Sequence, residues 1–414
     1  MRFGIKTLDD FEFKGKTVLC RIDINQPVDR STGKLKSINR IQACVPTIRE
    51  LSEKGAKVVL MAHQGSDIEY KNYYTTRPHA DVLSSLLGFE VKWVEDVCGP
   101  TARDAISKLK EGEVLLLDNV RFMAEEQTLF ETKLCLSHEE QAKTQVVKKL
   151  APLGDIYVCD AFAAAHRDQP TLCAFEQLLP SAMGRLFEKE YCTVSALMEE
   201  PKRPCVFVLG GAKIADAFQM MKTVLEKGSA DCVLTGGLVA NIFLASQNVE
   251  IGKGSLDFIL KSNYGQFIDV AKDLYAKFKE KIILPLDLAW VDDGKRKEAA
   301  VGEIPKDISA VDIGSKTAEL YRTHIMKAKT VFVNGPAGVF EQEASELGTK
   351  AIWSALAETE AFTVLGGGDS ITATEKYGLT DKIGYICTGG GALIRFLSGE
   401  ELPVVKALRH GAKV

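Results

Sequence analysis

Residues 205–213 read CVFVLGGAK, and residues 17–25 read TVLCRIDIN. In both stretches a short apolar run with β-branched residues stops abruptly, in glycines in the first and in charged and polar residues in the second. A buried strand of a parallel sheet typically reads as such a continuous apolar run, and a helix then follows it. The two stretches therefore indicate α/β units built on parallel strands.

The same pattern recurs along the whole chain of 414 residues. The further apolar runs span residues 57–61, 113–117, 156–159, 232–235, 282–284, 330–333, 362–365 and 385–387. A chain of this length suits about two to three domains of ~150 residues each. We predict the α/β class, with two doubly wound parallel-sheet domains of the Rossmann-like kind.

A helix is predicted to join the two domains. Residues 184–204 carry apolar side chains at helical spacing and end in EEPKRP, which is typical of a domain boundary. We expect an N-terminal domain over residues 1–185, a connecting helix over 186–204 and a second domain over 205–390. The last segment, 391–414, is expected to pack back towards the N-terminal domain.

The composition is that of an ordinary globular protein. Hydrophobic residues make up 46% of the chain, and 52 Lys and Arg stand against 56 Asp and Glu. A formal charge of −4 provides no general attraction to nucleic acid or to an anionic membrane. The N-terminus lacks the apolar stretch of a signal peptide, and no apolar run approaches the ~18 residues that span a bilayer. We therefore expect a cytoplasmic protein.

The ten cysteines include no CxxC pair, so neither a zinc-ligand spacing nor a dithiol redox motif is present. Most of them lie in apolar runs, where a thiol behaves as a small buried hydrophobe. These are Cys20, Cys44, Cys159, Cys205, Cys232 and Cys387.

Basic side chains follow the strands of the first half. Arg21, Arg121 and Arg167 each come a few residues after the start or end of an apolar run, and His63 follows the run 57–61. Each of these alone could be a surface charge, a salt-bridge partner or a structural histidine. Because carboxyl ends of parallel strands share one edge of a sheet, their convergence favours a small polyanion as ligand.

Asp23 and Asn25 lie two residues apart after the first run. They are consistent with an Asx turn, and equally with acceptors for the hydroxyl groups of an oxygen-rich substrate.

Residues 125–150 are charged and helix-prone, and we expect a solvated excursion without a catalytic role.

Glycines follow the strands of the second half. Gly366–Gly368 precede Asp369 and Ser370, and Gly389–Gly391 follow another run. Such turns let a backbone approach a phosphate, although tight strand-to-helix turns alone also use glycine. Asp369 can cap the next helix or face Mg²⁺. The chain contains no GxxxxGK[ST], GxGxxG or DFG motif, and its HRD at residues 166–168 lacks the Asn that the kinase motif has five residues after the Asp. This argues against a Walker P-loop, a dinucleotide dehydrogenase and a protein kinase.

Taken in order, the motifs resemble those of the phosphoglycerate kinases. RIDINQPVD, INRIQACVPTI, AHQG, DNVRF and DAFAAAHR occur in the first half, and GGAKIAD, TGG, DIGSKT, VNGPAGVFE, GGGDS and TGGGA in the second. The resemblance covers nearly the whole chain. AHQG and HRDQPT are most similar to the archaeal branch of the family.

The resemblance implies reversible phosphoryl transfer from 1,3-bisphosphoglycerate to ADP, which gives 3-phosphoglycerate and ATP with Mg²⁺ as the cofactor. It implies a phosphoglycerate site formed by Asp23, Asn25, Arg40, His63, Gly65, Ser66, Arg121 and Arg167. It implies a nucleotide site formed by Gly211, Lys213, Gly236, Gly237, Asn334, Pro336, Glu341, Gly366, Gly367, Gly368, Asp369 and Ser370.

Further roles follow from the same resemblance. Arg40 and Lys213 are expected to act on the migrating phosphoryl group, and Gly389, Gly390 and Gly391 to form a phosphate cradle. Glu341 is directed to the ribose and Asp369 to the metal. Two charged substrates on separate domains must meet, so we expect a cleft that closes by hinge bending. The partners expected are these small molecules only, without nucleic acid or membrane, and the chain is expected to be a monomer.

Three positions depart from the family pattern. Many members have Arg where this chain has Ser66, Lys where it has Ala217, and Met where it has Ala337. A kinase of the same fold acting on another small phospho-carboxylate, and a catalytically silent nucleotide-binding protein, remain as alternative functions. Retention of Arg40, Lys213 and Asp369 argues against the silent protein.

Overall fold

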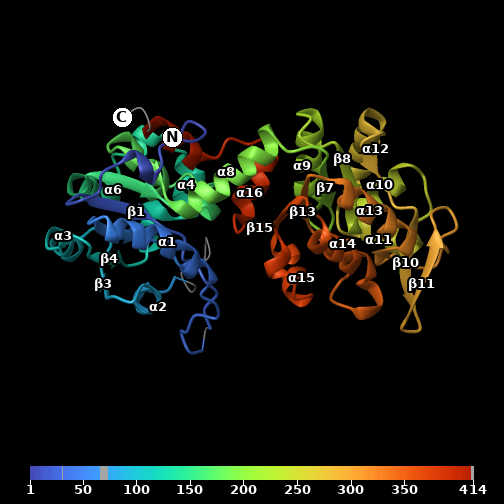
Figure 1. Cartoon of the computed structure of the whole chain (residues 1–414), viewed down its shortest axis with the longest axis horizontal. Helices are drawn as coiled ribbons and strands as arrows, with labels where there is room; N and C mark the ends of the chain where they lie inside the picture. Colours follow the sequence, from blue (N-terminus) through green and yellow to red (C-terminus); the bar gives the residue numbers. More distant parts are fainter. Residues whose placement is uncertain (30, 66–72, 412–414) are drawn as a thin grey trace. The chain divides into compact units, whose positions relative to one another are not determined.

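The structure, a computed structural model, describes residues 1–29, 31–65 and 73–411. The chain divides into two compact units (Figure 1). Unit 1 comprises Met1–Thr193 and Glu401–Val414, and unit 2 comprises Val194–Glu400. Each unit contains a six-stranded sheet in which all neighbouring strands are parallel. The predicted fold class is therefore confirmed.

The sheet of unit 1 has the strand order β3-β4-β2-β1-β5-β6. Its strands are β1 (Thr17–Arg21), β2 (Lys57–Met61), β3 (Val91–Val94), β4 (Val114–Leu117), β5 (Ile156–Cys159) and β6 (Ser181–Met183). Val18 and Leu19 point to opposite faces of the sheet, yet both side chains are fully buried. Both faces of this sheet are therefore covered, as a parallel sheet requires.

Helices supply that cover. The α-helices described in this unit are α1 (Asn39–Glu53), α2 (Arg77–Leu87), α3 (Pro100–Ser107), α4 (Thr128–Leu134), α5 (His138–Gln141), α6 (Gln145–Leu150), α7 (Pro170–Cys173), most of α8 (Arg185–Glu199) and α17 (Pro403–Gly411). On α1, Ile41, Cys44, Ile48 and Leu51 recur at helical spacing and all enter the core. This apolar stripe holds α1 against the sheet, and with it the position of Arg40.

The main sheet of unit 2 has the order β15-β14-β13-β7-β8-β9. Its strands are β7 (Cys205–Leu209), β8 (Cys232–Thr235), β9 (Ile282–Ile283), β13 (Thr330–Asn334), β14 (Phe362–Gly366) and β15 (Tyr385–Ile386). A separate antiparallel sheet is formed by β10 (Asp287–Asp292), β11 (Lys295–Ala300) and β12 (Asp312–Ile313).

Besides the end of α8, eight α-helices are described within residues Val194–Glu400 of unit 2. They are α9 (Ile214–Glu226), α10 (Gly237–Ser246), α11 (Lys253–Lys261), α12 (Gln266–Phe278), α13 (Ser315–Lys327), α14 (Leu347–Glu358), α15 (Gly368–Lys376) and α16 (Gly390–Leu397). Tyr321 of α13 and Trp353 of α14 are fully buried in the core under β13.

The boundary between the units lies within α8, between Thr193 and Val194. The chain returns to unit 1 at Glu401, ten residues later than the expected start of the returning segment at 391. The difference arises because α16 packs on α9 of unit 2, whereas α17 packs on β6 and α7 of unit 1. Both chain termini accordingly belong to unit 1 (Figure 1).

Several strands carry a weaker sequence signal than the apolar runs. In the edge strand β3, Lys92 and Trp93 are only half buried, so no continuous apolar run marks it. In the β10–β11 hairpin, β11 is polar, whereas Leu288–Trp290 of β10 are buried. The turn at Asp293 and Gly294 has positive φ at both residues, as a type I′ turn requires.

The ten cysteines are all free. Of the six expected to be buried, five are, and Cys232 is half buried. Within the described part of the chain, no helix combines the length and the apolarity that crossing a membrane demands.

Candidate active site

The predicted phosphoglycerate residues of unit 1 follow neighbouring strands. β4, β2, β1 and β5 are adjacent in the sheet, and Arg121, His63, Asp23 and Arg167 come after them in that order. The order of strands reverses at β1, which pairs with β2 on one side and β5 on the other. Such a switch point is where open α/β sheets bind ligands.

Arg40 forms an ion pair with Asp23. Its Nη1 lies 2.6 Å from Asp23 Oδ2; the carboxylate is almost fully buried, while 39% of the arginine side chain is exposed. Asp23 Oδ1 accepts the backbone N–H of Asn25 at 3.1 Å, which is an Asx turn. Asp23 thus anchors the loop and orients Arg40, while part of the guanidinium still faces solvent.

Asn25, Gly65 and Arg121 form one hydrogen-bonded group. The amide of Asn25 accepts the N–H of Gly65 at 2.9 Å, and Arg121 Nη1 donates to the Gly65 carbonyl. Arg121 is nearly buried, in a short 3₁₀ turn whose first N–H bonds are accepted by Asn119. Ser66, the next predicted residue, lies outside the described residues.

His63 is held by Arg21. Arg21 Nη2 lies 3.2 Å from His63 Nδ1, and Arg21 itself is fully buried, with further bonds to Thr171 and the Ile22 carbonyl. Burial, together with the positive charges of Arg21, Arg121, Arg40 and Arg167, lowers the pKa of His63 well below its ordinary value. The imidazole is therefore neutral. Because a guanidinium only donates, Nδ1 is the acceptor and Nε2 carries the proton.

Arg167 contacts two side chains of the segment 125–150, those of Thr128 and Glu131. Its Nη1 donates to Thr128 Oγ1 at 3.2 Å and lies 3.8 Å from Glu131 Oε2. Glu131 Oε1 also accepts the backbone N–H of Asp168 at 3.0 Å. We expected this excursion to be solvated and without a catalytic role; two of its side chains, Thr128 and Glu131, contact the loop that carries Arg167.

A buried carboxyl lies behind these cations. Glu126 accepts the N–H and the hydroxyl of Thr171, each at 2.7 Å. Burial raises the pKa of Glu126 to about 7, although the charge of Arg21 opposes the rise. The group therefore supplies only partial negative charge near neutral pH, which leaves the rim formed by Arg40, Arg121 and Arg167 cationic.

In unit 2 the strand order reverses at β7, which pairs with β13 and β8. Here the loops after β7 and β13 touch: the N–H of Gly211 donates to the Pro336 carbonyl at 2.8 Å. A Cβ on Gly210 would lie 2.2 Å from the same oxygen, so only glycine permits this approach.

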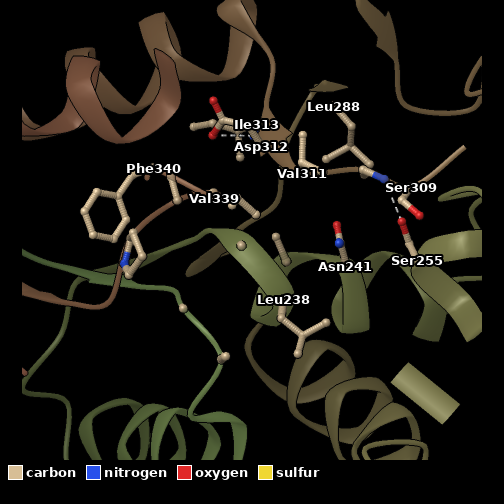
Figure 2. A pocket seen from close by; sticks show the side chains of 18 of the residues that line it. Leu238, Asn241, Ser255, Leu288, Ser309, Val311, Asp312, Ile313, Val339 and Phe340 are labelled. Atoms are coloured by element: carbon tan, nitrogen blue, oxygen red, sulfur yellow. Dashed lines mark hydrogen bonds between the residues drawn. The ribbon is translucent and has the colours of Figure 1, made fainter. Parts of the chain in front are cut away.

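A cavity of about 460 Å³ opens beside these loops. Figure 2 shows Leu238 and Asn241 rising from α10 on one side, with Val311 and Val339 on the other. Five of the predicted nucleotide-site residues line this cavity: Gly211, Gly237, Pro336, Glu341 and Asp369. Ala337, which stands where many family members have Met, lines it as well. Its volume is that of an ordinary small-molecule site, and its walls are mostly apolar with a few polar groups.

Other predicted residues support this wall without lining the cavity. Ser370 Oγ accepts the N–H of Gly335 at 2.8 Å. Asn334 is buried at the end of β13, and a Cβ on Gly367 would lie 2.5 Å from its Oδ1. Gly367 also has a φ of +88°, which favours glycine independently. Gly236 donates its N–H to the Leu209 carbonyl at 2.9 Å.

The glycine triplets are not uniform. At Gly366 a Cβ would lie 2.3 Å from Leu393 of α16, so packing alone requires that glycine. At Gly368 and Gly390 a Cβ would meet nothing within 4 Å. These two begin α15 and α16 and are the ones that leave room for a ligand; Gly389 and Gly391 flank the second of them.

Lys213 and Ala217 lie on α9 or at its start. Lys213 stands at the N-cap and is exposed, whereas Ala217 is buried. Among the residues that the structure describes, the Lys213 ammonium and the carboxylates of Glu341 and Asp369 have no hydrogen bond or ion pair. These exposed charges are therefore available to a ligand.

Sequence reasoning missed part of the cavity wall. The additional lining residues include Leu238, Asn241, Ser255, Phe258, Leu288, Ser309, Val311, Asp312 and Phe340. Leu238, Asn241, Ser255 and Phe258 lie on the helices α10 and α11, and Leu288 and Asp312 lie in the antiparallel sheet. Asp312 was visible only as the first letter of DIGSKT; burial raises its pKa to about 6, although Arg296 lies 3.0 Å away.

Comparison with known proteins adds an independent result. The family model described as phosphoglycerate kinase matches residues 8–400. The phosphoglycerate kinase of Methanothermobacter thermautotrophicus is 49% identical over 409 residues, which cover 99% of this chain and 97% of the relative. That of Thermococcus kodakarensis is 44% identical over 407 residues, covering 97% and 96%.

A solved structure agrees in fold as well. The crystal structure of phosphoglycerate kinase from Pyrococcus horikoshii has a TM-score of 0.85 at 42% identity, and the match covers 99% of this chain and 100% of that chain. The resemblance to the archaeal branch is thus confirmed. The chain belongs to the phosphoglycerate kinase family.

Proposed function

We propose that unit 1 binds the phosphoglycerate at its cationic rim and that unit 2 binds the nucleotide in the cavity beside β7 and β13. Phosphoglycerate kinases transfer a phosphoryl group reversibly between 1,3-bisphosphoglycerate and ADP, and therefore take small-molecule substrates. The main support for this assignment is the position of three arginines around a neutral His63 at the switch point of the sheet. These are Arg40, Arg121 and Arg167.

The rim suits a small phosphorylated acid. Guanidinium groups bind phosphate and carboxylate oxygens through two parallel hydrogen bonds, and the Nε2–H of His63 adds a neutral donor. The side chains of Asp23 and Asn25 each accept one hydrogen bond from a loop backbone N–H. We propose that their oxygen atoms also accept a hydrogen bond from the substrate hydroxyl. A ligand without that hydroxyl would leave these acceptors unpaired and bind more weakly.

The cavity suits a nucleotide. Leu238, Val311 and Val339 provide apolar walls for a flat base, and 40% of Val339 is exposed. We assign Glu341 to the ribose hydroxyls. The phosphates would then reach the start of α15, where Gly368 leaves open space and the N–H groups favour an anion. Gly389, Gly390 and Gly391 form a second such start on α16.

Asp369 would hold Mg²⁺. Its exposed carboxylate, free of partners within the described residues, stands in the first turn of α15 and lines the cavity. Mg²⁺ binds to one or two carboxylates together with phosphate oxygens and water, so this single carboxylate fits. When bound, the ion would neutralise charge on the nucleotide phosphates.

Arg40 and Lys213 would stabilise the phosphoryl group during transfer. Phosphoryl transfer needs positioning and charge neutralisation, and an acceptor that is already anionic needs no general base. Because the two substrates are assigned to different units, we propose that hinge bending brings them together and excludes water. A cytoplasmic monomer would suffice for this chemistry.

A coupled assay with 3-phosphoglycerate and ATP tests the proposal, with nucleotide binding measured in parallel by calorimetry. Turnover that depends on both substrates and on Mg²⁺ is expected. Turnover on a different phospho-carboxylate would replace the substrate assigned here. Normal ATP binding without any turnover would instead support a silent nucleotide-binding protein.

A further inference from the structure

A histidine, an aspartate and a cysteine meet beside the loop that carries Arg167. His138 begins α5, Asp168 follows Arg167, and Cys173 ends α7. One nitrogen, oxygen or sulfur atom from each lies within 4.8 Å of the other two. His138 Nε2 is 3.2 Å from Asp168 Oδ1. None of these three side chains has a role in the function proposed above.

The cluster is sheltered but open on one side. Cys173 is fully buried, whereas 14% of the His138 side chain and 40% of the Asp168 side chain are exposed. An ion could therefore enter past Asp168 and reach the thiol. Desolvation raises the pKa of Cys173 well above its ordinary value, so without a cation the sulfur keeps its proton.

A fourth polar side chain adjoins the cluster. Gln141 is almost fully buried, and its Nε2 donates to Asp168 Oδ1 at 2.7 Å. Its Oε1 is buried with no hydrogen-bond partner among the described residues. A buried amide oxygen next to a carboxylate, an imidazole and a thiol is an available oxygen donor, and leaving it unpaired costs free energy.

Hydrogen bonds explain this arrangement only in part. The contact between His138 Nε2 and Asp168 Oδ1 has an ordinary hydrogen-bond length. The thiol of Cys173 donates a weak hydrogen bond to the Arg167 carbonyl at 3.5 Å. Those bonds leave Gln141 Oε1 unsatisfied. The Cys173 thiol also forms a hydrogen bond with the Asp168 side chain, which accounts for its approach to the carboxylate but not for its approach to the imidazole.

A tetrahedral cation accounts for all three donors. Zn²⁺ binds histidine nitrogen and carboxylate oxygen at about 2.0 Å and thiolate sulfur at about 2.3 Å. Two tetrahedral bonds of about 2.0 Å place their ligand atoms roughly 3.3 Å apart, close to the separation of His138 Nε2 and Asp168 Oδ1. Mg²⁺ and Ca²⁺ prefer oxygen ligands only, so a mixed set of nitrogen, oxygen and sulfur argues against them.

We propose that His138, Asp168 and Cys173 form a binding site for a borderline-soft divalent cation such as Zn²⁺. Water or Gln141 Oε1 completes the coordination. On binding, the S–H bond of Cys173 breaks, the proton leaves to solvent and a metal–thiolate bond forms. His138 exchanges the proton that Nε2 shares with Asp168 for one on Nδ1, through solvent, and then binds through the lone pair on Nε2. The ion would tie α5 to α7 and to Asp168, and so stabilise this part of unit 1.

Cobalt provides the sharpest test, because a thiolate ligand gives Co²⁺ a charge-transfer absorption in the near ultraviolet. The full-length protein is first freed of metal with a chelator and then titrated with Co²⁺ and, by calorimetry, with Zn²⁺. We expect one ion per chain, a thiolate–cobalt band, displacement by Zn²⁺ but not by excess Mg²⁺, and a raised Tm with Zn²⁺.

Matched variants locate the site. Cys173→Ser should abolish the band, and His138→Gln, at a position where 14% of the side chain is exposed, should weaken Zn²⁺ binding by about tenfold or more. Cys135→Ser removes an exposed thiol outside the cluster and should change neither result. The proposal is overturned if the wild type binds no Zn²⁺, if His138→Gln binds it equally well, or if the band disappears with Cys135 and not with Cys173.

Discussion

The Nη2 of Arg21 lies 3.2 Å from the Nδ1 of His63, and both side chains are buried at the end of their strands. This contact fixes the histidine as a neutral donor through Nε2 in the middle of the arginines. The rim therefore combines permanent guanidinium charges with a neutral hydrogen bond, and its charge does not depend on a histidine that titrates near pH 7.

The neutral state of His63 can be tested through the pH dependence of activity. Because the pKa of His63 is held well below its ordinary value, His63 stays neutral from pH 6 to 8, and kcat/KM for 3-phosphoglycerate should show no inflection from it. His63→Gln keeps an N–H donor and should raise KM about tenfold, with the same pH profile. An inflection present in the wild type and absent in the variant would contradict this.

Arg40 should matter to turnover more than to folding. Arg40→Ala is expected to lower kcat by on the order of a thousandfold, as for other arginines at migrating phosphoryl groups. Arg40→Lys keeps the charge but loses the planar fork, and should fall in between. Thermal unfolding of both variants is the control, since Asp23 loses its ion-pair partner. An unchanged kcat in Arg40→Ala would remove it from the mechanism.

Asp369 should set the Mg²⁺ requirement. Asp369→Asn is expected to raise the Mg²⁺ concentration for half-maximal activity by about tenfold, because one anionic ligand is lost. Activity titrated against Mg²⁺ at saturating ATP measures this. Asp381→Asn, an exposed aspartate in the 3₁₀ turn Thr380–Lys382, is the matched control and should titrate like the wild type. Equal titrations of Asp369→Asn and the wild type would contradict the assignment.

Glu131 should act as a positioning residue for Arg167. Glu131→Gln removes the charge near the guanidinium and weakens the bond to Asp168. We expect KM for 3-phosphoglycerate to rise several-fold, roughly 3- to 10-fold, with kcat changed less. Glu139→Gln, an exposed glutamate on α5, is the control. Equal KM values for the two variants would show that Glu131 has no such role.

Asp160 should make stability depend on pH. Its Oδ1 accepts the N–H groups of Leu186 and Phe187, and burial raises its pKa from 3.8 to about 7. The folded state therefore holds this proton more tightly than the unfolded state, and the free energy of unfolding falls as pH rises from about 4 to 7. Relative to Asp160→Asn, the wild type should lose ~1.4 kcal/mol per pH unit in that window.

Urea unfolding of the wild type and Asp160→Asn at several pH values measures this difference. Above about pH 7 the two curves should run parallel, because the carboxyl is then ionised in both states of the wild type. A constant difference from pH 4 to 7 would show that Asp160 is already charged in the folded protein.

The parallel sheets, and the edge at which the basic and glycine-rich loops follow the strands, could be predicted from the sequence. Runs such as 205–209 can be buried on both faces only in a parallel sheet, and Arg121, His63 and Arg167 follow such runs. The sequence also specified Gly368 and Asp369 at the start of a helix. These features depend on local order along the chain, which is why they can be read from it.

Contacts between segments that are distant in the sequence could not be predicted and are seen in the folded chain. Folding brought Glu131 to Arg167, seated α16 against Gly366, and assembled the cavity wall from Asn241, Val311 and Val339. Polar strands such as β11 contain no apolar run that would predict them, because they gain stability from pairing rather than from burial. Such pairings depend on which surfaces meet after folding, and no local pattern records that.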